Sequence, residues 1–322
     1  METWFAEGAA VLVTGGRGFL GSHICLRLAA LAPAGCEVIS LDNGTRDAFT
    51  ALGQPAPVNL RFVDGDLLEP EQWLGELGRP SVVVHCAALA GVSTYYRKPT
   101  EVLRVNGLGS ARLFEALAAL DPGLVVNLST SEVYGPHAEG VAEGDLTPIG
   151  PISDPRWAYA ASKIFAEHLL FAMAREHGLS VLSLRPFNVY GPGQVGEGAV
   201  RNFCERAAAG QALRVTGDGS PSRAWLYVDD FVDALFALVA VPSAWGRAYN
   251  VGAPDSRVST LELAELINKL AGNEAGVEFE PHPGQDVVHR WPRIDALTTA
   301  TGWRPRVGLE DGLRRTVGFW QQ

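Results

Sequence analysis

The chain of 322 residues is poor in cysteine, in positive charge and in long apolar runs. Its four cysteines (Cys25, Cys36, Cys86 and Cys204) form no CxxC pair and no Cys/His ligand spacing, so we expect reduced, mostly buried thiols and no metal site. No apolar stretch approaches the roughly 20 residues needed to span a bilayer. The first residues lack the basic segment of a signal peptide. We therefore expect a soluble cytoplasmic protein with no membrane partner.

The formal net charge of -10 argues against a nucleic-acid-binding protein, because such proteins carry a basic surface. It does not exclude a small anionic ligand, since a local site can oppose the net charge. Hydrophobic residues make up 47% of the chain and charged residues 19%, which is enough material for a large core. The length predicts two domains, or one large α/β unit with a smaller lobe.

In the first half of the chain, short β-branched apolar runs alternate with helical patterns. The runs cover residues 10–14, 36–42, 60–66, 81–87 and 123–129. A helical pattern over 157–177 then leads into a further run over 179–185. Apolar runs without alternation indicate strands buried on both faces, as in a parallel sheet flanked by helices. The pattern predicts a doubly wound (Rossmann) α/β fold, with one continuous helix over 101–120.

After residue 188 the elements become shorter and more mixed. Helical patterns near 201–209, 229–239 and 260–272 alternate with strands at 213–215 and 224–228. We expect a smaller mixed α/β lobe that binds substrate. The predicted boundaries are a sheet domain over 1–187, to which 224–252 contribute, and a lobe formed mainly by 188–322.

The stretch "TGGRGFLGS" joins the first predicted strand to the first helix and carries Gly15, Gly18 and Gly21 in a GxxGxxG pattern. Such a loop lets the backbone approach phosphate oxygens, and the helix N-terminus adds partial positive charge. The second strand ends in "LDN", where Asp42 can accept hydrogen bonds from both adenosine ribose hydroxyls, or can simply cap a turn. Its carboxylate would repel a 2′-phosphate, so the pattern favours NAD over NADP, although Arg46 lies nearby.

Tyr159 and Lys163 stand four residues apart in "WAYAASKIF", on one face of the predicted helix. A free tyrosine has a pKa of about 10, and a neighbouring ammonium would lower it. Such a tyrosine can take a proton from a hydroxyl group while hydride leaves for nicotinamide. Thr130, at the end of an earlier strand, would bond the same substrate oxygen.

Several motifs occur together in one order along nearly the whole chain. They are "TGGRGFLG", "LDN", "VDGDL", "HCAA", "VLRVNGLGS", "STSEVYG", "RPFNVYGPGQ", "GDGSPSRAWLYVDD" and "TGWRPRVGLEDGL", together with Tyr159 and Lys163. In these motifs the chain resembles an extended short-chain dehydrogenase/reductase of the nucleotide-sugar epimerase/dehydratase family. The resemblance implies a tightly bound NAD, a nucleotide-diphosphate sugar as substrate, and a homodimer joined by two helices from each subunit.

The resemblance also implies roles for individual residues. The NAD-binding residues would be Gly15, Gly18, Phe19, Leu20, Gly21, Asp42, Asn43, Asp66, Leu67, Ala87, Ala88, Asn106, Tyr159, Lys163 and Pro186. The catalytic residues would be Thr130, Ser131, Glu132, Tyr159 and Lys163. The substrate-binding residues would be Asn188, Val200, Val215, Arg223 and Arg290, with Asn188 and Arg223 on the diphosphate. His282 stands where the family often has a diphosphate-binding arginine; either Arg290 or Arg293 compensates, or both pack the loop.

Family members share one opening step, the oxidation of the sugar C4 hydroxyl to a ketone. Epimerases then return hydride to the other face, dehydratases take the C5 proton and eliminate water, and decarboxylases lose the carboxylate of a uronic acid. We expect C4 epimerisation first, glucuronate-type decarboxylation second and 4,6-dehydration third. A reductase with a dissociable cofactor and a non-catalytic dinucleotide-binding regulator are more distant alternatives.

Glu132 bears on this choice. "STSE" resembles GDP-mannose dehydratases and UDP-glucuronate decarboxylases, whereas Ser131 replaces the aspartate of the dTDP-glucose dehydratases. Because residues alternate sides along a strand, Glu132 is predicted to share the orientation of Thr130 and to lie near C5 of the sugar. The alternative is a carboxylate bonded to strand-end amides.

Overall fold

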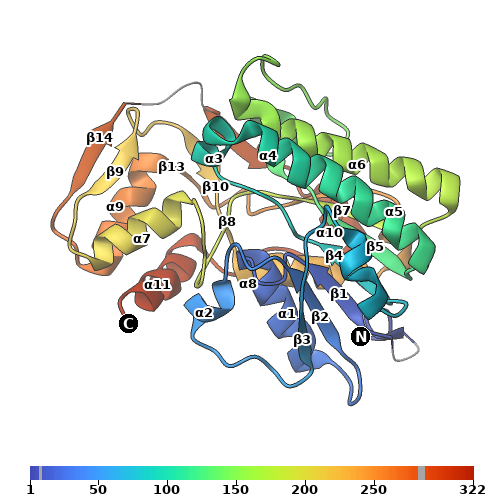
Figure 1. Cartoon of the computed structure of the whole chain (residues 1–322). Helices are drawn as coiled ribbons and strands as arrows, with labels where there is room; N and C mark the ends of the chain where they lie inside the picture. The colour runs from blue at the N-terminus through green and yellow to red at the C-terminus, as the bar shows by residue number, and fades with distance from the viewer. Residues whose placement is uncertain (7–8, 282–286) are drawn as a thin grey trace.

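The computed structural model describes residues 1–6, 9–281 and 287–322, and it is built around a seven-stranded parallel sheet (Figure 1). The strand order is β12-β7-β5-β4-β1-β2-β3. The strands are β1 (Val11–Thr14), β2 (Val38–Asp42), β3 (Leu60–Asp64), β4 (Val82–His85), β5 (Leu124–Leu128), β7 (Val181–Pro186) and β12 (Ala248–Val251). The order reverses between β1 and β4, and in such sheets ligands bind at the carboxyl ends of the strands beside this switch point.

Helices cover both faces of the sheet, which confirms the predicted doubly wound fold. Alternate residues of β1 serve the two sides: Val11 and Val13 face one apolar core, and Leu12 faces the other. The first core contains α1 (Phe19–Leu31), α8 (Val228–Val239) and α10 (Asp295–Thr301); the second contains α5 (Ser110–Leu120) and α6 (Ala158–His177). In the described part of the chain, no helix is both long and apolar enough to cross a membrane.

A third apolar core lies at the end of the molecule drawn in yellow to red, beyond the sheet (Figure 1). It is formed by α7 (Ala199–Ala208), α9 (Thr260–Ala271), α11 (Leu309–Trp320) and the parallel pair β9 (Leu213–Thr216) and β14 (Val277–Glu280). A short parallel pair, β8 (Val189–Tyr190) and β11 (Leu226–Tyr227), joins this lobe to the sheet. We call this region the substrate lobe, after the role that is expected for it from the sequence. From the C-terminal half, β12 and α8 pack with the central sheet instead.

A second sheet links the two halves of the chain. Its order is β13-β10-β15-β6, with β13 (Arg257–Ser259), β10 (Ser222–Ala224), β15 (His289–Pro292) and β6 (His137–Val141). The parallel pairing of β15 with β6 sets Arg290 opposite Ala138. A residue near the C-terminus is thereby brought beside the segment that follows β5.

The predicted continuous helix over 101–120 is interrupted. The remaining short helices are α2 (Ala48–Leu52), α3 (Val92–Arg97) and α4 (Pro99–Leu103), and between α4 and α5 the residues Arg104–Gly109 form a π-helical turn. Such turns often occur at functional sites. Here the turn carries Asn106, whose side-chain amide both donates to and accepts from the backbone of Leu89.

A buried polar network ties the segment after β5 to α6 and to the sheet edge. Arg185 of β7 pairs with Glu167 of α6 and donates to the Tyr134 hydroxyl at 2.7 Å. Tyr134 in turn donates to Asn250 of β12, also at 2.7 Å. Both partners of the ion pair are less than a tenth exposed, so each depends on the other for compensation of its charge.

Replacing Arg185 by methionine should lower the free energy of unfolding by about 3 kcal/mol or more, because Glu167 is left buried without a counter-charge. Urea denaturation followed by circular dichroism measures the change. The matched control is Arg79→Met, which removes an exposed ion pair with Asp121 and should cost less than about 1 kcal/mol. Equal losses in the two variants would contradict the structural role of the Arg185 network.

Candidate active site

The glycine loop after β1 is shaped for close backbone approach. Gly15 has φ 67°, and a Cβ there would lie 2.6 Å from the Cα of Ala87. A Cβ on Gly21 would lie 2.1 Å from the carbonyl oxygen of Gly15. No side chain caps the N-terminus of α1 at Gly18, so its first amides face the loop and suit a diphosphate.

A cavity opens above this loop, and it contains all the predicted NAD-binding residues except Asn106. The predicted residues that line it are Gly15, Gly18, Phe19, Leu20, Gly21, Asp42, Asn43, Asp66, Leu67, Ala87, Ala88, Tyr159, Lys163 and Pro186. The sequence analysis did not assign further lining residues to this site, which are Leu41, Thr45, Arg46, Gly65, Cys86, Leu89, Ala90, Val105, Leu128, Ser129, Gln194, Val195 and Glu197. The last three belong to the loop between β8 and α7, and no local motif marks that loop as part of a cofactor site.

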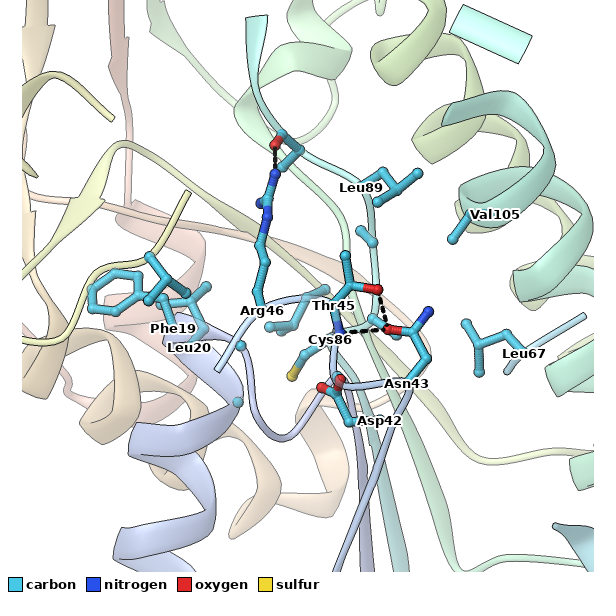
Figure 2. A pocket seen from close by; sticks show the side chains of 18 of the residues that line it. Phe19, Leu20, Asp42, Asn43, Thr45, Arg46, Leu67, Cys86, Leu89 and Val105 are labelled. Atoms are coloured by element: carbon cyan, nitrogen blue, oxygen red, sulfur yellow. Dashed lines mark hydrogen bonds between the residues drawn. The ribbon is translucent and has the colours of Figure 1, made fainter. Parts of the chain in front are cut away.

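Asp42 is held in a fixed orientation at the cavity wall. Its Oδ2 accepts from the amide of Arg17 at 3.0 Å and its Oδ1 from the amide of Gly44 at 2.8 Å. A carboxylate has further lone pairs for two ribose hydroxyls. Arg46 extends away from Asp42 and donates to the carbonyl of Ala90 at 2.7 Å (Figure 2). The guanidinium that would have suited NADP is therefore directed elsewhere, and the cavity fits NAD.

Asn106 does not contact the cavity, contrary to the prediction. Its side chain is fully buried and forms a closed pair of hydrogen bonds with Leu89, at 2.7 and 3.0 Å. Leu89 lines the cavity (Figure 2). Asn106 therefore supports the wall of the cavity from behind, because the π-helical turn directs its amide toward the backbone of the loop.

Thr130, Tyr159 and Lys163 all line this cavity. The Thr130 hydroxyl is hydrogen-bonded to the Tyr159 phenol. Lys163 is almost fully buried and donates to the carbonyl of Leu128 at 2.8 Å. Burial lowers the pKa of Lys163 to about 8, against the opposing influence of Cys86 and Glu167.

The predicted lowering of the Tyr159 pKa is not found in the structure. Burial raises that pKa, and the charge of Glu132 raises it further, while the hydrogen bond with Thr130 acts in the opposite direction. The physical reason is the desolvation of the Tyr159 side chain, because burial disfavours the charged phenolate. When bound there, NAD would add the positive charge of its nicotinamide ring and would accept and return a hydride.

Glu132 is not the strand residue that its spacing predicted. Strand β5 ends at Leu128, and Ser131–Tyr134 form a 3-10 turn capped by the Thr130 side chain. The turn ends the strand alternation, so Glu132 lines a second cavity while Thr130 lines the first. Ser131 is buried and lines neither.

The carboxylate of Glu132 is shared by two arginines. Arg156 donates to it at 2.8 and 3.3 Å, and Arg290 donates at 2.5 Å. Burial alone would raise the pKa of Glu132, but Arg290 and Arg156 lower it to about 2. Glu132 is thus an ionised carboxylate bound by guanidinium groups and not by strand-end amides. Sequence spacing gave no signal for Arg156, and its pairing comes from the fold alone.

The second cavity, of about 1140 Å³, lies between the sheet and the substrate lobe. Of the predicted substrate-binding residues, Asn188, Val200, Arg223 and Arg290 line it. Asn188 has an unusual positive φ of 41°, a strained conformation that is often found at functional sites. The second cavity is also lined by Arg97, Arg206 and Arg214. Positively charged side chains are therefore concentrated at this cavity, although the protein as a whole is acidic.

Val215 is a wrong prediction, because it is fully buried in the core of the substrate lobe. Its neighbour Thr216 lines the cavity instead, since side chains alternate along β9. Arg293 pairs with Asp295 at the surface, and His282 lies outside the described residues. Within the described ranges, no group of three or more His, Cys, Asp and Glu side chains could hold a metal ion.

A dinucleotide cavity at the switch point, a Tyr/Lys/Thr group on its wall and an adjoining cationic cavity define an NAD-dependent enzyme of short-chain dehydrogenase/reductase architecture. The family model for the NAD dependent epimerase/dehydratase family matches residues 11–252, and the chain belongs to that family. Relatives of the chain in this family modify nucleotide sugars, and the family uses NAD as its cofactor.

Curated relatives of similar identity differ in the reaction that they catalyse. The chain is 34% identical over 318 residues to the low-salt glycan biosynthesis protein Agl12 of Haloferax volcanii, covering 96% of this chain and 98% of that protein. It is 33% identical to dTDP-glucose 4,6-dehydratase of Streptomyces niveus, covering 97% and 92%. It is 31% identical to UDP-N-acetyl-alpha-D-glucosaminuronate decarboxylase of Bacillus cytotoxicus, covering 97% of each.

Solved structures of similar fold include epimerases and a protein that binds UDP-glucuronic acid and NAD. The epimerase Mth375 of Methanothermobacter thermautotrophicus superposes with a TM-score of 0.88 at 32% identity, covering 99% of this chain and 94% of that one. UDP-glucose 4-epimerase of Thermotoga maritima, with UDP-glucose, gives 0.85 at 31%, covering 97% and 98%. MoeE5 in complex with UDP-glucuronic acid and NAD gives 0.82 at 31%, covering 96% and 98%.

The orientation of Asp42 predicts the cofactor preference. Purified protein, once denatured, should release NAD+ or NADH, and Asp42→Ala should also release NADP(H), because the 2′-phosphate loses its repulsive neighbour. Chromatography of the released nucleotides measures this. Asp47→Ala, which removes an exposed carboxylate bonded to Thr50, is the matched control and should keep the native preference. Recovery of NADP(H) alone from the native protein would refute the prediction.

Tyr159→Phe keeps the ring but removes the ionisable oxygen. We expect kcat to fall by about a hundredfold or more with the fold intact, the loss typical of a missing general base. The control Tyr249→Phe removes a hydroxyl bonded to Ala244 on the edge strand and should turn over normally. Near-native turnover in Tyr159→Phe would assign the base elsewhere.

Proposed function

We propose that this enzyme oxidises the C4 hydroxyl of a nucleotide-diphosphate sugar, with Tyr159 as the base and Thr130 bonded to the reacting oxygen. Support comes from the meeting of the two cavities: they share Ala90, Gln194 and Glu197. A sugar in the cationic cavity would reach Tyr159 on the wall of the cofactor cavity. Buried Lys163 would stabilise the phenolate after it forms.

The diphosphate is assigned to Asn188 and Arg223, as the family resemblance implies. Both residues lie on the cavity wall next to β10 and β15. Asn188 donates to the carbonyl of Ala224 at 3.0 Å, and Arg223 donates to the carbonyl of Ser222 at 3.0 Å. These contacts fix the direction of both side chains. A planar guanidinium has the geometry that suits phosphate oxygens.

For the second step, the Glu132–Arg156–Arg290 cluster supports a sugar that carries a carboxylate. Two guanidinium groups bond to one carboxylate in this cluster, and the same cavity is lined by Arg97, Arg206 and Arg214. Both arginines of the cluster are nearly fully buried, and a charge in such surroundings attracts an opposite charge more strongly than it would in water. The geometry therefore favours a nucleotide-linked uronic acid.

Decarboxylation is the reaction that suits these groups best. Once C4 is a ketone, the C5–C6 bond can break with loss of carbon dioxide, and its electron pair passes to the C4 oxygen, where Tyr159 donates a proton. Solvent then supplies a proton at C5 while the enol oxygen returns its proton to Tyr159, which restores the C4 ketone. Because Glu132 is held by two arginines at a pKa of about 2, it is a poor base for the C5 proton, which weakens the case for 4,6-dehydration.

C4 epimerisation, the first expectation from the sequence, is the second candidate. It is supported by the similarity to solved epimerases over nearly the whole chain. This reaction requires the 4-keto sugar to rotate within the site so that hydride returns to its other face. The cavity of about 1140 Å³ offers room for that rotation. A uronic acid could also undergo this reaction, so substrate class and reaction type are separate questions.

A homodimer is proposed through α5 and α6. The exposed apolar side chains Leu103, Leu108 and Phe165 lie along α4, the π-helical turn and α6. These segments pack against one another and are drawn together on one face of the molecule (Figure 1). A second copy on this face would cover apolar surface that water otherwise contacts.

A panel of nucleotide sugars in heavy water, followed by NMR, tests the proposal. We expect turnover of a nucleotide-linked uronic acid with release of carbon dioxide and one deuterium at C5. A 4-epimer without deuterium at C5 would support the second candidate. Turnover restricted to neutral sugars would refute the carboxylate assignment.

Glu132→Gln should separate the two steps, because glutamine keeps the size but removes the charged carboxylate that Arg156 and Arg290 share. The variant should still reduce bound NAD+ when substrate is added, yet release carbon dioxide at least about tenfold more slowly, as expected for misplaced groups. Glu139→Gln on the exposed side of β6 is the control. Carbon dioxide release at the native rate from Glu132→Gln would contradict a role for the cluster.

A further inference from the structure

Glu197 makes a contact that crosses the cleft between the two cavities. It lies between β8 and α7, and its carboxylate accepts hydrogen bonds from the amide of Ser93 at 2.8 Å and from the amide and hydroxyl of Thr94 at 3.2 and 3.1 Å. The Ser93 hydroxyl donates as well. We call this group the Glu197 clasp. It fastens the loop that begins the substrate lobe to the first turn of α3, which lies about a hundred residues earlier.

Gly91 leaves the space that the clasp requires. Its φ is 135°, a conformation that side chains rarely adopt. A Cβ at this position would lie 2.7 Å from the Cδ of Glu197. The carboxylate can therefore approach the amides of α3 only because position 91 is glycine.

The helix held by the clasp carries Tyr95, which stacks on Tyr159. The ring centroids lie 5.0 Å apart with an interplanar angle of 10°. The Tyr95 ring also lies near Arg156 in the turn before α6, with the guanidinium carbon 5.8 Å from the ring centroid. Tyr95 thus connects the clasp to the proposed base and to the Glu132 cluster. We therefore expect a displacement of α3 to disturb the stacking of Tyr95 on the Tyr159 ring.

The other end of the clasp covers the cofactor cavity. Gln194, Val195 and Glu197 all line that cavity. Beneath this loop, Arg46 reaches across to the carbonyl of Ala90 (Figure 2), and a Cβ on Gly196 would lie 2.8 Å from the guanidinium carbon of Arg46. The loop therefore lies against Arg46, and the clasp keeps it there.

We propose that Glu197 is a positioning residue, which holds Tyr95 against Tyr159 and closes the cofactor cavity by joining the substrate lobe to α3. The effect on turnover rests on the proposed function of Tyr159. The effect on cofactor retention is independent of the sugar and of the reaction. The two effects are measured separately for that reason.

Cofactor retention is measured first. Enzyme loaded with NADH is mixed with excess NAD+, and the loss of bound NADH fluorescence gives the release rate. Glu197→Ala should release NADH about tenfold faster than the native enzyme, and Glu265→Ala, an exposed carboxylate on α9, should not change the rate. A native release rate in Glu197→Ala overturns the proposal, whether or not any sugar is turned over.

The link through Tyr95 is measured with a double-mutant cycle on the active sugar substrate. Glu197→Ala and Tyr95→Leu should each lower kcat by roughly tenfold with little change in KM, as expected when a reacting group is displaced. The double variant should be no slower than the slower single variant, because both act through one contact. Tyr95→Phe keeps the ring and should restore turnover. Losses that multiply, or a slow Tyr95→Phe, overturn the link.

Protein stability is followed in parallel, because a carboxylate that caps a helix also contributes to folding. If Glu197→Ala lowers the Tm by more than Glu265→Ala does, the release experiment is repeated with Ser93→Ala in place of Glu197→Ala. The Ser93→Ala variant removes one hydroxyl donor and leaves the Glu197 carboxylate in position. Faster NADH release from a stable Ser93→Ala variant supports the clasp. Native release from a stable Ser93→Ala variant overturns it.

Discussion

The shared carboxylate of Glu132 is the contact on which the geometry of the site depends. It joins the turn after β5, the turn before α6 and strand β15, through Arg156 and Arg290. All three charges lie away from solvent, so each is costly without the others. The cluster therefore couples the order of the substrate cavity to the pairing of β15 with β6.

The two cavities meet because of the direction of the parallel strands. The glycine loop and the Ala87–Ala88 pair follow strands of the sheet, Asp42 is the last residue of β2, and Thr130 follows β5. The carboxyl ends of parallel strands lie at one edge, and the reversal of strand order opens a crevice there. Helix α6 then brings Tyr159 and Lys163 to the same edge, while the substrate lobe closes the crevice from the other side.

The sequence predicted best those features that depend on short spacing. The glycine pattern predicted the loop that lines the first cavity, and the spacing placed Asp42 at the end of a strand on the wall of the same cavity. The predicted cavity contacts of Asn106 and Val215 are not found. A π-helical turn directs the Asn106 side chain away from the first cavity, and strand alternation directs the Val215 side chain away from the second. Glu132 was expected on a strand, but the 3-10 turn gave it different neighbours from Thr130.

By itself, the sequence determined the doubly wound fold, the NAD site and the family, because buried strands, glycine loops and helical faces are local patterns with fixed periods. The tertiary structure decided that Arg156 and Arg290 meet at Glu132 on the wall of the second cavity, and it decided the contact across the cleft. Arg290 lies 158 residues from Glu132, and Glu197 lies 104 from Ser93. Contacts of this kind depend on how sheets and lobes pack, so the spacing of residues along the sequence does not predict them.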